Sequence, residues 1–300
     1  MESGKNFISV KDWASKYGVS ERTARNYCAS GKIDGVFLVG KTWNIPADAK
    51  LPPRKKKFKV SPLLNELRQQ KEDKLPNGIY HRIQIDLTYN SNHIEGSRLT
   101  HEQTRYIFET NTIGITDESV NIDDIIETSN HFRAIDYIIE TIDEKLNEHL
   151  IKHLHFLLKS GTSDERKSWF NVGEYKKLPN EVGGEETTPP KSVHKAIMDL
   201  LKEYNSIKQP GLEDIIDFHQ RFEKIHPFQD GNGRVGRLIM FRECLRNEIV
   251  PFIITENLKW YYYRGLHNWP SVKGYLIDTC LLAQDNFKII LDYFRIKYKA

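Results

Sequence analysis

Ile225-His226-Pro227-Phe228-Gln229-Asp230-Gly231-Asn232-Gly233-Arg234-Val235-Gly236-Arg237 is the stretch from which the fold can be worked out. It separates two runs of apolar residues at the three-to-four spacing of an amphipathic helix. One run ends near Ile225, and the other begins near Gly233 or Arg234. The loop between them is rich in glycine and leads directly into the second run, which predicts a helix–loop–helix unit.

The start of the second helix is suited to binding several phosphates. Backbone N–H groups without helical partners point out of a helix start, and the helix dipole favours an anion there. Gly231 and Gly233 allow the backbone to curl into a concave nest of such donors. Arg234 and Arg237 are three residues apart and lie on one side of the first turns. Two guanidiniums beside an anion nest indicate a polyphosphate.

Two further side chains of the stretch indicate group transfer. Asp230 alone would repel phosphate, and a bridging Mg²⁺ removes this conflict because Mg²⁺ binds through one or two carboxylates plus substrate oxygens. A neutral His226 imidazole can take a proton from an attacking hydroxyl. Together these groups predict transfer of a phosphorus-centred group. The P-loop and kinase patterns are absent from the sequence, and one histidine with one aspartate is too few for a structural zinc site.

The stretch resembles the Fic family signature, HxFx[D/E]GNGRxxR, and agrees with it at every specified position. The similarity covers about residues 62–300 and implies a mainly α fold, a Fic-type helical bundle. It implies that His226 deprotonates the target hydroxyl and that Asp230 holds Mg²⁺ between the α- and β-phosphates of ATP. AMP would pass to a Ser, Thr or Tyr hydroxyl of a target protein or of the chain itself, and pyrophosphate would leave.

The resemblance also assigns residues to the nucleotide. Phosphate would be cradled by the glycine-rich loop, and the two arginines would bind the β- and γ-phosphates, while Phe228 anchors the loop. Tyr262 and Tyr263 stand where similar proteins have a Tyr-Tyr pair lining the adenine pocket, although a packed aromatic stripe is the alternative interpretation. The nucleotide-binding set implied is Phe228, Gly231, Asn232, Gly233, Arg234, Gly236, Arg237, Tyr262 and Tyr263.

Apolar residues at three-to-four spacing predict helices over Asn121–Thr141, Glu144–Leu158, Ser192–Tyr204, Leu212–Ile225, Arg234–Asn247 and Leu276–Tyr298. Residues 172–190 break this helical pattern. Gly183-Gly184 divide two extendable stretches there, Tyr175–Val182 and Glu185–Thr188, which predict a β-hairpin. The resemblance implies that this hairpin is a flap over the active site. Its edge would dock an extended segment of the target protein by strand addition.

Ser91-Asn92-His93-Ile94-Glu95-Gly96 matches [S/T]xxxE[G/N], the inhibitory motif of Fic proteins. The resemblance implies a helix that ends near Glu95, with Gly96 as its stop and Ser91 positioning it. It also implies that Glu95 pairs with Arg237, so that this guanidinium cannot receive the γ-phosphate. A solvated surface carboxylate is the alternative for Glu95. Some family members use the same glutamate to remove AMP, and the sequence leaves that activity open.

The N-terminal residues have a different pattern. Two short helices are predicted over Val10–Tyr17 and Glu21–Ser30, with a turn at Gly18, Ser20 as an N-cap, and a hairpin over residues 36–45. This order resembles the small winged helix-turn-helix modules of the MerR and excisionase type. The resemblance implies that the second helix enters the major groove of DNA. The candidate DNA contacts are Arg22, Thr23, Arg25, Asn26 and Lys41.

Charge is uneven along the chain. Residues 1–60 carry 13 Lys/Arg and 5 Asp/Glu, a net charge of +8, whereas the other 240 residues carry 31 and 36, a net charge of −5. A basic head favours double-stranded DNA as the partner of residues 1–60, and a solvated surface is the alternative. The expected domains are a winged helix-turn-helix-like domain over 1–50, a basic linker over 51–61 and a Fic-type domain over 62–300.

Composition restricts the class of protein. The chain has 28% charged and 39% hydrophobic residues, which is ordinary for a soluble globular protein. Cys28, Cys244 and Cys280 form no CxxC pair, so reduced thiols are expected. The N-terminus has no apolar signal stretch, and no apolar run reaches 18 residues. We therefore expect a cytoplasmic protein without a membrane span.

Two other functions stay open on the sequence. One is a DNA-binding transcriptional regulator whose Fic domain senses nucleotide or has lost activity, although the intact signature argues against loss. The other keeps the fold and changes the donor to another nucleotide, phosphocholine or phosphate. The presence of both Arg234 and Arg237 favours a triphosphate donor.

Overall fold

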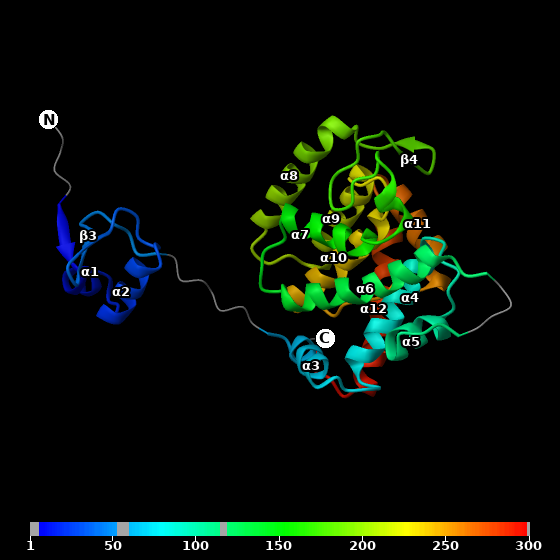
Figure 1. Ribbon diagram of the computed structural model, residues 1–300, viewed down its shortest axis with the longest axis horizontal. Helices are drawn as coiled ribbons and strands as arrows, with labels where there is room; N and C mark the ends of the chain where they lie inside the picture. Colours follow the sequence, from blue (N-terminus) through cyan, green and yellow to red (C-terminus); the bar gives the residue numbers. More distant parts are fainter. Residues whose placement is uncertain (1–5, 53–59, 115–118, 299–300) are drawn as a thin grey trace. The chain divides into compact units, whose positions relative to one another are not determined.

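The structure is a computed structural model that describes residues 6–52, 60–114 and 119–298. Contacts along the chain divide it into two compact units, residues 1–58 and 59–300, and each unit is described by itself (Figure 1). Most of the predicted linker, 51–61, lies outside the described residues. Within the described ranges, every helix is too short or too polar to bridge a bilayer.

The smaller unit packs two helices against a sheet. Its elements are β1 (Phe7–Ser9), α1 (Val10–Tyr17), α2 (Glu21–Ala29), β2 (Phe37–Val39) and β3 (Thr42–Pro46), and the antiparallel strand order is β1-β3-β2. The predicted helices and hairpin are present. Ser20 caps α2 by accepting a hydrogen bond from the Thr23 N–H, and Gly18 has a φ of 63° in the turn. Trp13 is fully buried at the centre of the core.

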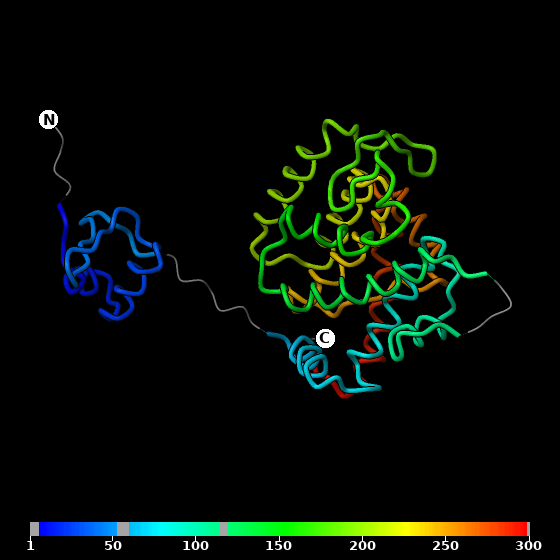
Figure 2. The backbone as a smooth tube through the Cα atoms, in the orientation of Figure 1, coloured from blue at the N-terminus to red at the C-terminus, as the bar shows by residue number. Residues whose placement is uncertain are grey.

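The larger unit is a helical bundle. Its elements in chain order are α3 (Pro62–Asp73), α4 (Ile79–Ile94), α5 (His101–Thr110), α6 (Ile122–Glu140), α7 (Glu148–Lys159), η1 (Ser163–Arg166), β4 (Glu181–Val182), β5 (Glu185–Glu186), α8 (Pro190–Ser206), α9 (Leu212–Ile225), α10 (Asn232–Arg246), η2 (Glu256–Leu258), α11 (Lys259–Asn268) and α12 (Gly274–Tyr293). The mainly α prediction is therefore confirmed for this unit. The chain's last described residues lie beside α3 (Figure 2), where Leu63 and Tyr298 line one small cavity.

Helix α10 is the centre of the bundle. Every residue from Asn232 to Leu245 is buried, and the helix packs against α4, α6, α7 and α9 (Figure 1). A helix that is buried all round must satisfy its polar side chains within the protein. Its first two turns carry Arg234 and Arg237, so these two guanidiniums need anionic partners from the surrounding elements.

Two predicted helices differ from those observed at their ends. The helix expected over residues 144–158 begins only at Glu148, because Asn147 caps it by accepting a hydrogen bond from the Leu150 N–H at 2.9 Å. The helix expected over 276–298 ends at Tyr293, and Arg295 takes the left-handed conformation with a φ of 55°. The helix of the inhibitory motif, α4, ends at Ile94, and Gly96 follows with a φ of 100°.

The flap hairpin is shorter than predicted. Only β4 and β5 pair, around Gly183 and Gly184, whose φ angles of 60° and 82° suit a two-residue hairpin turn. The predicted strand over Tyr175–Val182 is wrong for most of its length. The Lys176 N–H instead donates to the carbonyl of Pro227 at 2.9 Å, so this segment is bonded to the loop after α9.

Candidate active site

The loop between α9 and α10 places His226 at its start. His226 ends α9 in the left-handed conformation, with a φ of 49°, a strained backbone that is common at functional sites. Its Nδ1 lies 3.2 Å from the carbonyl of Glu223. Because a carbonyl can only accept, Nδ1 carries the proton and Nε2 keeps a free lone pair. Burial is the main cause that lowers the pKa of His226 below its usual 6.5, so the imidazole is neutral near pH 7.

Phe228 and Asn232 hold this loop in shape. The Phe228 ring is fully buried and stacks face to face on His155, with 4.0 Å between ring centroids. The Asn232 side chain accepts from the Phe228 N–H at 2.8 Å and donates to the Phe228 carbonyl at 2.9 Å. Phe228 therefore anchors the loop from inside the core, as expected, and Asn232 closes the loop's two ends.

Glu95 and Arg237 meet at the start of α10, although they are 142 residues apart in the chain. The Arg237 Nη2 donates to Glu95 Oε1 at 2.6 Å and to the Ser91 carbonyl at 2.9 Å, and its Nε donates to Ser91 Oγ at 3.1 Å. The predicted pairing is therefore present, with Ser91 as a second partner. The Arg237 side chain is 4% exposed and that of Glu95 is 28% exposed, so α4 presents the carboxylate from the solvent side.

The Glu95 carboxylate also lies directly on the glycine nest. A Cβ built on Gly233 would meet Glu95 Oε1 at 2.1 Å and Arg237 Nη1 at 2.9 Å. A side chain at position 233 would displace the Glu95 carboxylate, so an anion already lies where the sequence predicts phosphate. Among the described residues, Nη1 of Arg237 is buried without a hydrogen-bond partner. An unpaired buried donor of this kind is costly unless a ligand meets it.

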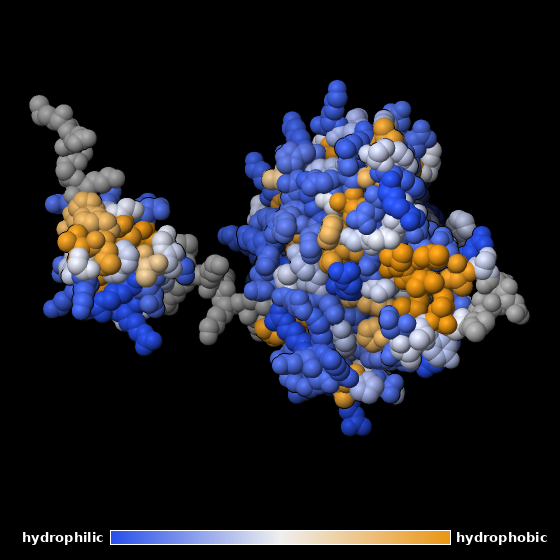
Figure 3. Space-filling view, viewed as in Figure 1, coloured by the Kyte–Doolittle hydropathy of each residue, from blue (hydrophilic) through white to orange (hydrophobic). Residues whose placement is uncertain are grey.

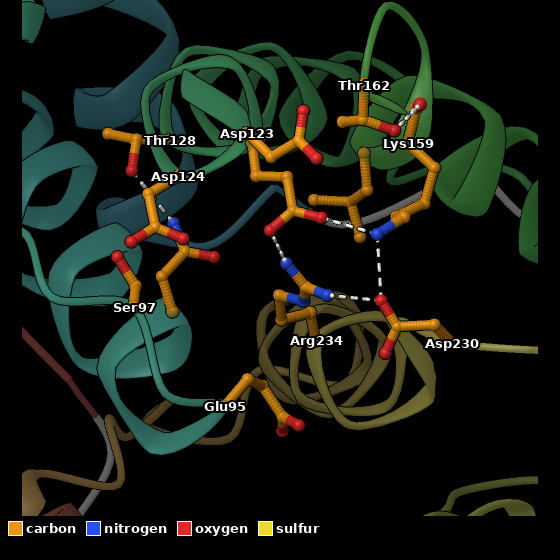
Figure 4. Close-up of polar contacts among 12 residues, drawn as sticks. Glu95, Ser97, Asp123, Asp124, Thr128, Lys159, Thr162, Asp230 and Arg234 are labelled. Carbon is orange, nitrogen blue, oxygen red and sulfur yellow. Dashed lines mark hydrogen bonds and ion pairs between the residues drawn. The ribbon is translucent and has the colours of Figure 1, made fainter. Parts of the chain in front are cut away.

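A second charge cluster surrounds Asp230 (Figure 4). The Lys159 Nζ lies 2.7 Å from Asp230 Oδ2 and 2.5 Å from Glu127 Oε1, and Arg234 pairs with both of these carboxylates. Burial opposes ionisation of Asp230, but the charges of Arg234 and Lys159 hold its pKa well below the usual range. Burial likewise disfavours charge on Lys159, yet Asp230 and Glu127 raise its pKa to about 12. Both groups are charged at neutral pH.

Tyr262 and Tyr263 lie on α11, close to Arg237. Tyr262 is 1% exposed, its hydroxyl lies 2.7 Å from His219 Nε2, and its ring lies under the Arg237 guanidinium at 5.9 Å. Tyr263 is more exposed, at 38%, and its hydroxyl donates to the Ile94 carbonyl at 3.4 Å. Tyr262 is thus packed in the core, and Tyr263 borders the Glu95 end of α4.

Gly236 is placed against α9. A Cβ there would meet Glu223 Oε1 at 2.4 Å and His219 Nδ1 at 2.8 Å, so Gly236 allows α9 and α10 to pack closely. Burial raises the pKa of Glu223 to about 8, although Arg237 opposes this rise. Glu223 is therefore largely uncharged at pH 7 and does not compete with Glu95 for Arg237.

Lys176 links the flap to His226. Its buried Nζ donates to Asn180 Oδ1 at 2.7 Å and to Thr187 Oγ1 at 2.5 Å, which joins the two sides of the flap. It also lies 3.4 Å from the carbonyl of Ile225, next to His226. Burial lowers the pKa of Lys176 to about 8, and its remaining positive charge further disfavours an imidazolium at His226.

Sequence reasoning missed five charged residues near the site: Glu127, Lys159, Asp164, Lys176 and Glu223. Two of them had a detectable signal. Lys159 follows buried His155 by four residues, and Glu127 precedes buried His131 by four, so helical spacing places each on a buried face. A charged residue on such a face needs a partner of opposite charge. Lys176 lies in the irregular flap, where periodicity gives no such signal.

The arrangement defines the class of this domain. Residues 145–244 match the Fic/DOC family, and this range includes α7, the flap, α8, α9 and all but the last two residues of α10. The matched range contains the whole α9–α10 loop that carries the signature.

Known proteins resemble this chain beyond that range. A protein named protein adenylyltransferase Fic from Drosophila grimshawi is 27% identical over 209 residues, which is 67% of this chain and 39% of the fly protein. One of the same name from Nematostella vectensis is 28% identical over 191 residues, 60% of this chain and 42% of the relative. The chain thus spans about two fifths of the length of the curated relatives it matches.

Solved structures show the same fold. A Fic domain-containing signalling protein from Bacteroides thetaiotaomicron superposes with a TM-score of 0.61 at 23% identity, over 76% of this chain and 94% of that one. Fic-1 from C. elegans superposes with a TM-score of 0.60 at 18% identity, over 78% of this chain and 72% of the C. elegans chain. At these identities the likeness concerns the fold alone.

Proposed function

We propose that this chain is a Mg²⁺-dependent protein adenylyltransferase that moves AMP from ATP to a hydroxyl of a target protein or of itself and is restrained by Glu95. The observation that carries the proposal is the α9–α10 loop. It joins a neutral imidazole, an exposed carboxylate and a helix start with two arginines. Relatives named adenylyltransferases support the same reaction.

Different residues around the loop would carry the separate steps of the reaction. The α10 start and Arg237 hold the phosphates once Glu95 has moved. His226 Nε2 takes the proton from the acceptor hydroxyl, whose oxygen bonds to the α-phosphorus while the bond to the β-phosphate oxygen breaks and pyrophosphate leaves. The flap docks the acceptor segment, and Lys176 keeps it in register with His226.

Asp230 fits the role of metal ligand. Both of its ion pairs go to the same oxygen, Oδ2, and the side chain is still 51% exposed. One carboxylate that reaches solvent beside a phosphate site suits Mg²⁺, which keeps several waters and takes substrate oxygens. When bound, Mg²⁺ would neutralise charge that develops on the phosphates.

Removal of divalent cation is therefore expected to stop the reaction. Transfer of labelled AMP from ATP is measured with Mg²⁺, with EDTA, and with Mg²⁺ restored, in wild type and in Asp230→Asn. We expect EDTA to abolish labelling, Mg²⁺ to restore it, and Asp230→Asn to lower it at least about 100-fold. Labelling that persists in EDTA, or that Asp230→Asn leaves unchanged, would contradict the metal assignment.

DNA binding by the smaller unit is a second candidate function. The exposed face of α2 carries Arg22, Arg25 and Asn26, and Lys41 is exposed at the hairpin turn. Arg25 pairs with Glu21 at 2.7 Å, so it is less free for DNA than Arg22. The rest of this surface is not uniformly basic. Figure 3 shows an apolar area on the smaller unit, and Leu38 and Val39 of β2 are 52% and 60% exposed. Recognition would therefore depend on α2.

This candidate predicts a difference between two single charge losses. Binding of the full chain to a labelled duplex, which the chain itself has selected from a random-sequence pool, is followed by fluorescence anisotropy. Arg22→Ala is expected to weaken binding about tenfold, since a bidentate base contact contributes about 1–3 kcal/mol. Lys11→Ala removes the same charge from exposed α1 and is expected to have a smaller effect. Equal losses, or no binding by wild type, would count against major-groove recognition.

A further inference from the structure

Three carboxylates next to the proposed catalytic loop are arranged as if around a cation. Oxygens of Glu127, Asp164 and Asp230 lie within 4.8 Å of one another, and they come from α6, η1 and the α9–α10 loop. The centre is taken by Lys159. Its Nζ lies 2.5 Å from Glu127 Oε1, 2.5 Å from Asp164 Oδ2 and 2.7 Å from Asp230 Oδ2. The ammonium thus lies where the three carboxylates would otherwise hold a metal ion, and Figure 4 shows its contact with Asp230.

The cluster is largely shielded from solvent. The Lys159 side chain is 3% exposed, and the side chains of Glu127 and Asp164 are 12% and 15% exposed. Arg234 is the second buried cation of the cluster, and the three carboxylates with these two buried cations carry a net charge of −1. Only Asp230 reaches solvent to a large extent. Charge-assisted contacts that are shielded from water are stronger than surface pairs and fix side-chain geometry.

Both cations contact Asp230 through the same oxygen. Lys159 lies at 2.7 Å and Arg234 at 3.1 Å from Oδ2, and neither ion pair involves Oδ1. Asp230 is a loop residue with a half-exposed side chain, so it would otherwise sample several rotamers. The two contacts from the protein interior select one orientation.

We propose that Lys159 is the positioning residue for Asp230: its ammonium takes the place of a cation among the three carboxylates and turns Oδ2 inward, so that the other oxygen is left for the divalent cation that accompanies the nucleotide. The inference rests on the proposed function and concerns how that site holds its metal. Lys159 acts through Asp230 and does not itself contact the nucleotide.

The test needs a variant that keeps the charge balance. Lys159→Met alone leaves three carboxylates against one guanidinium, which would destabilise the fold. Lys159→Met combined with Asp164→Asn removes one positive and one negative charge, so the net charge of the network stays −1. Both changes are made in Glu95→Gly, where the phosphate site is free. The matched control is Lys167→Gln, because Lys167 pairs with Asp164 at 2.5 Å but does not contact Asp230.

Mn²⁺ is the probe, and electron paramagnetic resonance measures its binding with an ATP analogue whose α–β bridge is a methylene group. We expect the dissociation constant for Mn²⁺ to rise about tenfold in the charge-balanced pair, the size of one charge-assisted contact. The constant for the analogue at saturating Mn²⁺ should change less than about threefold. Lys167→Gln should match its parent.

Each other result has a clear meaning. An unchanged Mn²⁺ affinity would overturn the positioning role, and so would equal weakening of Mn²⁺ and analogue, because the change would then act on the whole pocket. Absence of bound Mn²⁺ in Glu95→Gly itself would contradict the proposed function. The two failures are therefore distinguishable.

Discussion

Replacing Glu95 with glycine is expected to raise AMP transfer about 30-fold. The carboxylate pairs with Arg237 at 2.6 Å and lies against Gly233, so it would compete with phosphate for the guanidinium and for the start of α10 in the proposed reaction. Removing about 2 kcal/mol of such competition corresponds to this factor. The measurement is the initial rate of labelled AMP transfer from ATP at equal protein concentration.

Two variants distinguish loss of the Glu95–Arg237 contact from a general effect of mutation near the end of α4. Glu95→Gln keeps the side-chain length without the charge and should give an intermediate rate. Glu256→Gln removes another carboxylate near the same helix end, where it pairs with His93 at 3.1 Å, and should leave the rate unchanged. If Glu95→Gly is no more active than wild type, Glu95 is not the brake.

His226→Ala, made in Glu95→Gly, is expected to lower transfer about 1000-fold, within the usual range for loss of a general base. The imidazole is neutral and lies at the end of α9 with its Nε2 free, and the proposed phosphate site lies at the start of α10. The variant should therefore still bind ATP with an affinity within about threefold of its parent. Single-turnover transfer and nucleotide titration measure the two quantities separately.

The control for this prediction is His101→Ala, which removes a half-exposed imidazole that pairs with Asp86 on the surface of the same unit. It should leave transfer unchanged. Transfer that survives in His226→Ala would show that another group accepts the proton, and a joint loss of transfer and ATP binding would show that His226 only shapes the loop.

The parts of the site that lie within one motif could be predicted from the sequence. The segment from His226 to Arg237 combines a helix end, glycines and a helix start. Apolar spacing and glycine positions within a few residues indicate each of these features. The contact between Glu95 and Arg237 is long-range, and it was predictable only because two motifs of one family occur in the same chain. Apolar spacing was enough to predict α1, α2, α6 to α10 and α12, with Ser20 as the N-cap of α2, whereas no range was predicted for α3, α5 or α11.

The parts that depend on packing between distant elements could not be predicted. Lys159, Glu127 and Asp164 come from three elements, and no local pattern says which of many charged residues will meet. The length of the flap strands was wrong because Lys176 bonds to the α9–α10 loop, a tertiary contact that overrides strand propensity. Strand β1 has three residues and was missed because its only cause is pairing with β3.

The most direct test of the account is calorimetric titration of ATP with Mg²⁺ into wild type, Glu95→Gly, and Glu95→Gly with Arg237→Ala. The account predicts weak or unmeasurable binding to wild type, clear one-to-one binding to Glu95→Gly, and loss of that binding when Arg237 is removed. Failure of Glu95→Gly to bind nucleotide, or binding that is indifferent to Arg237, would contradict it.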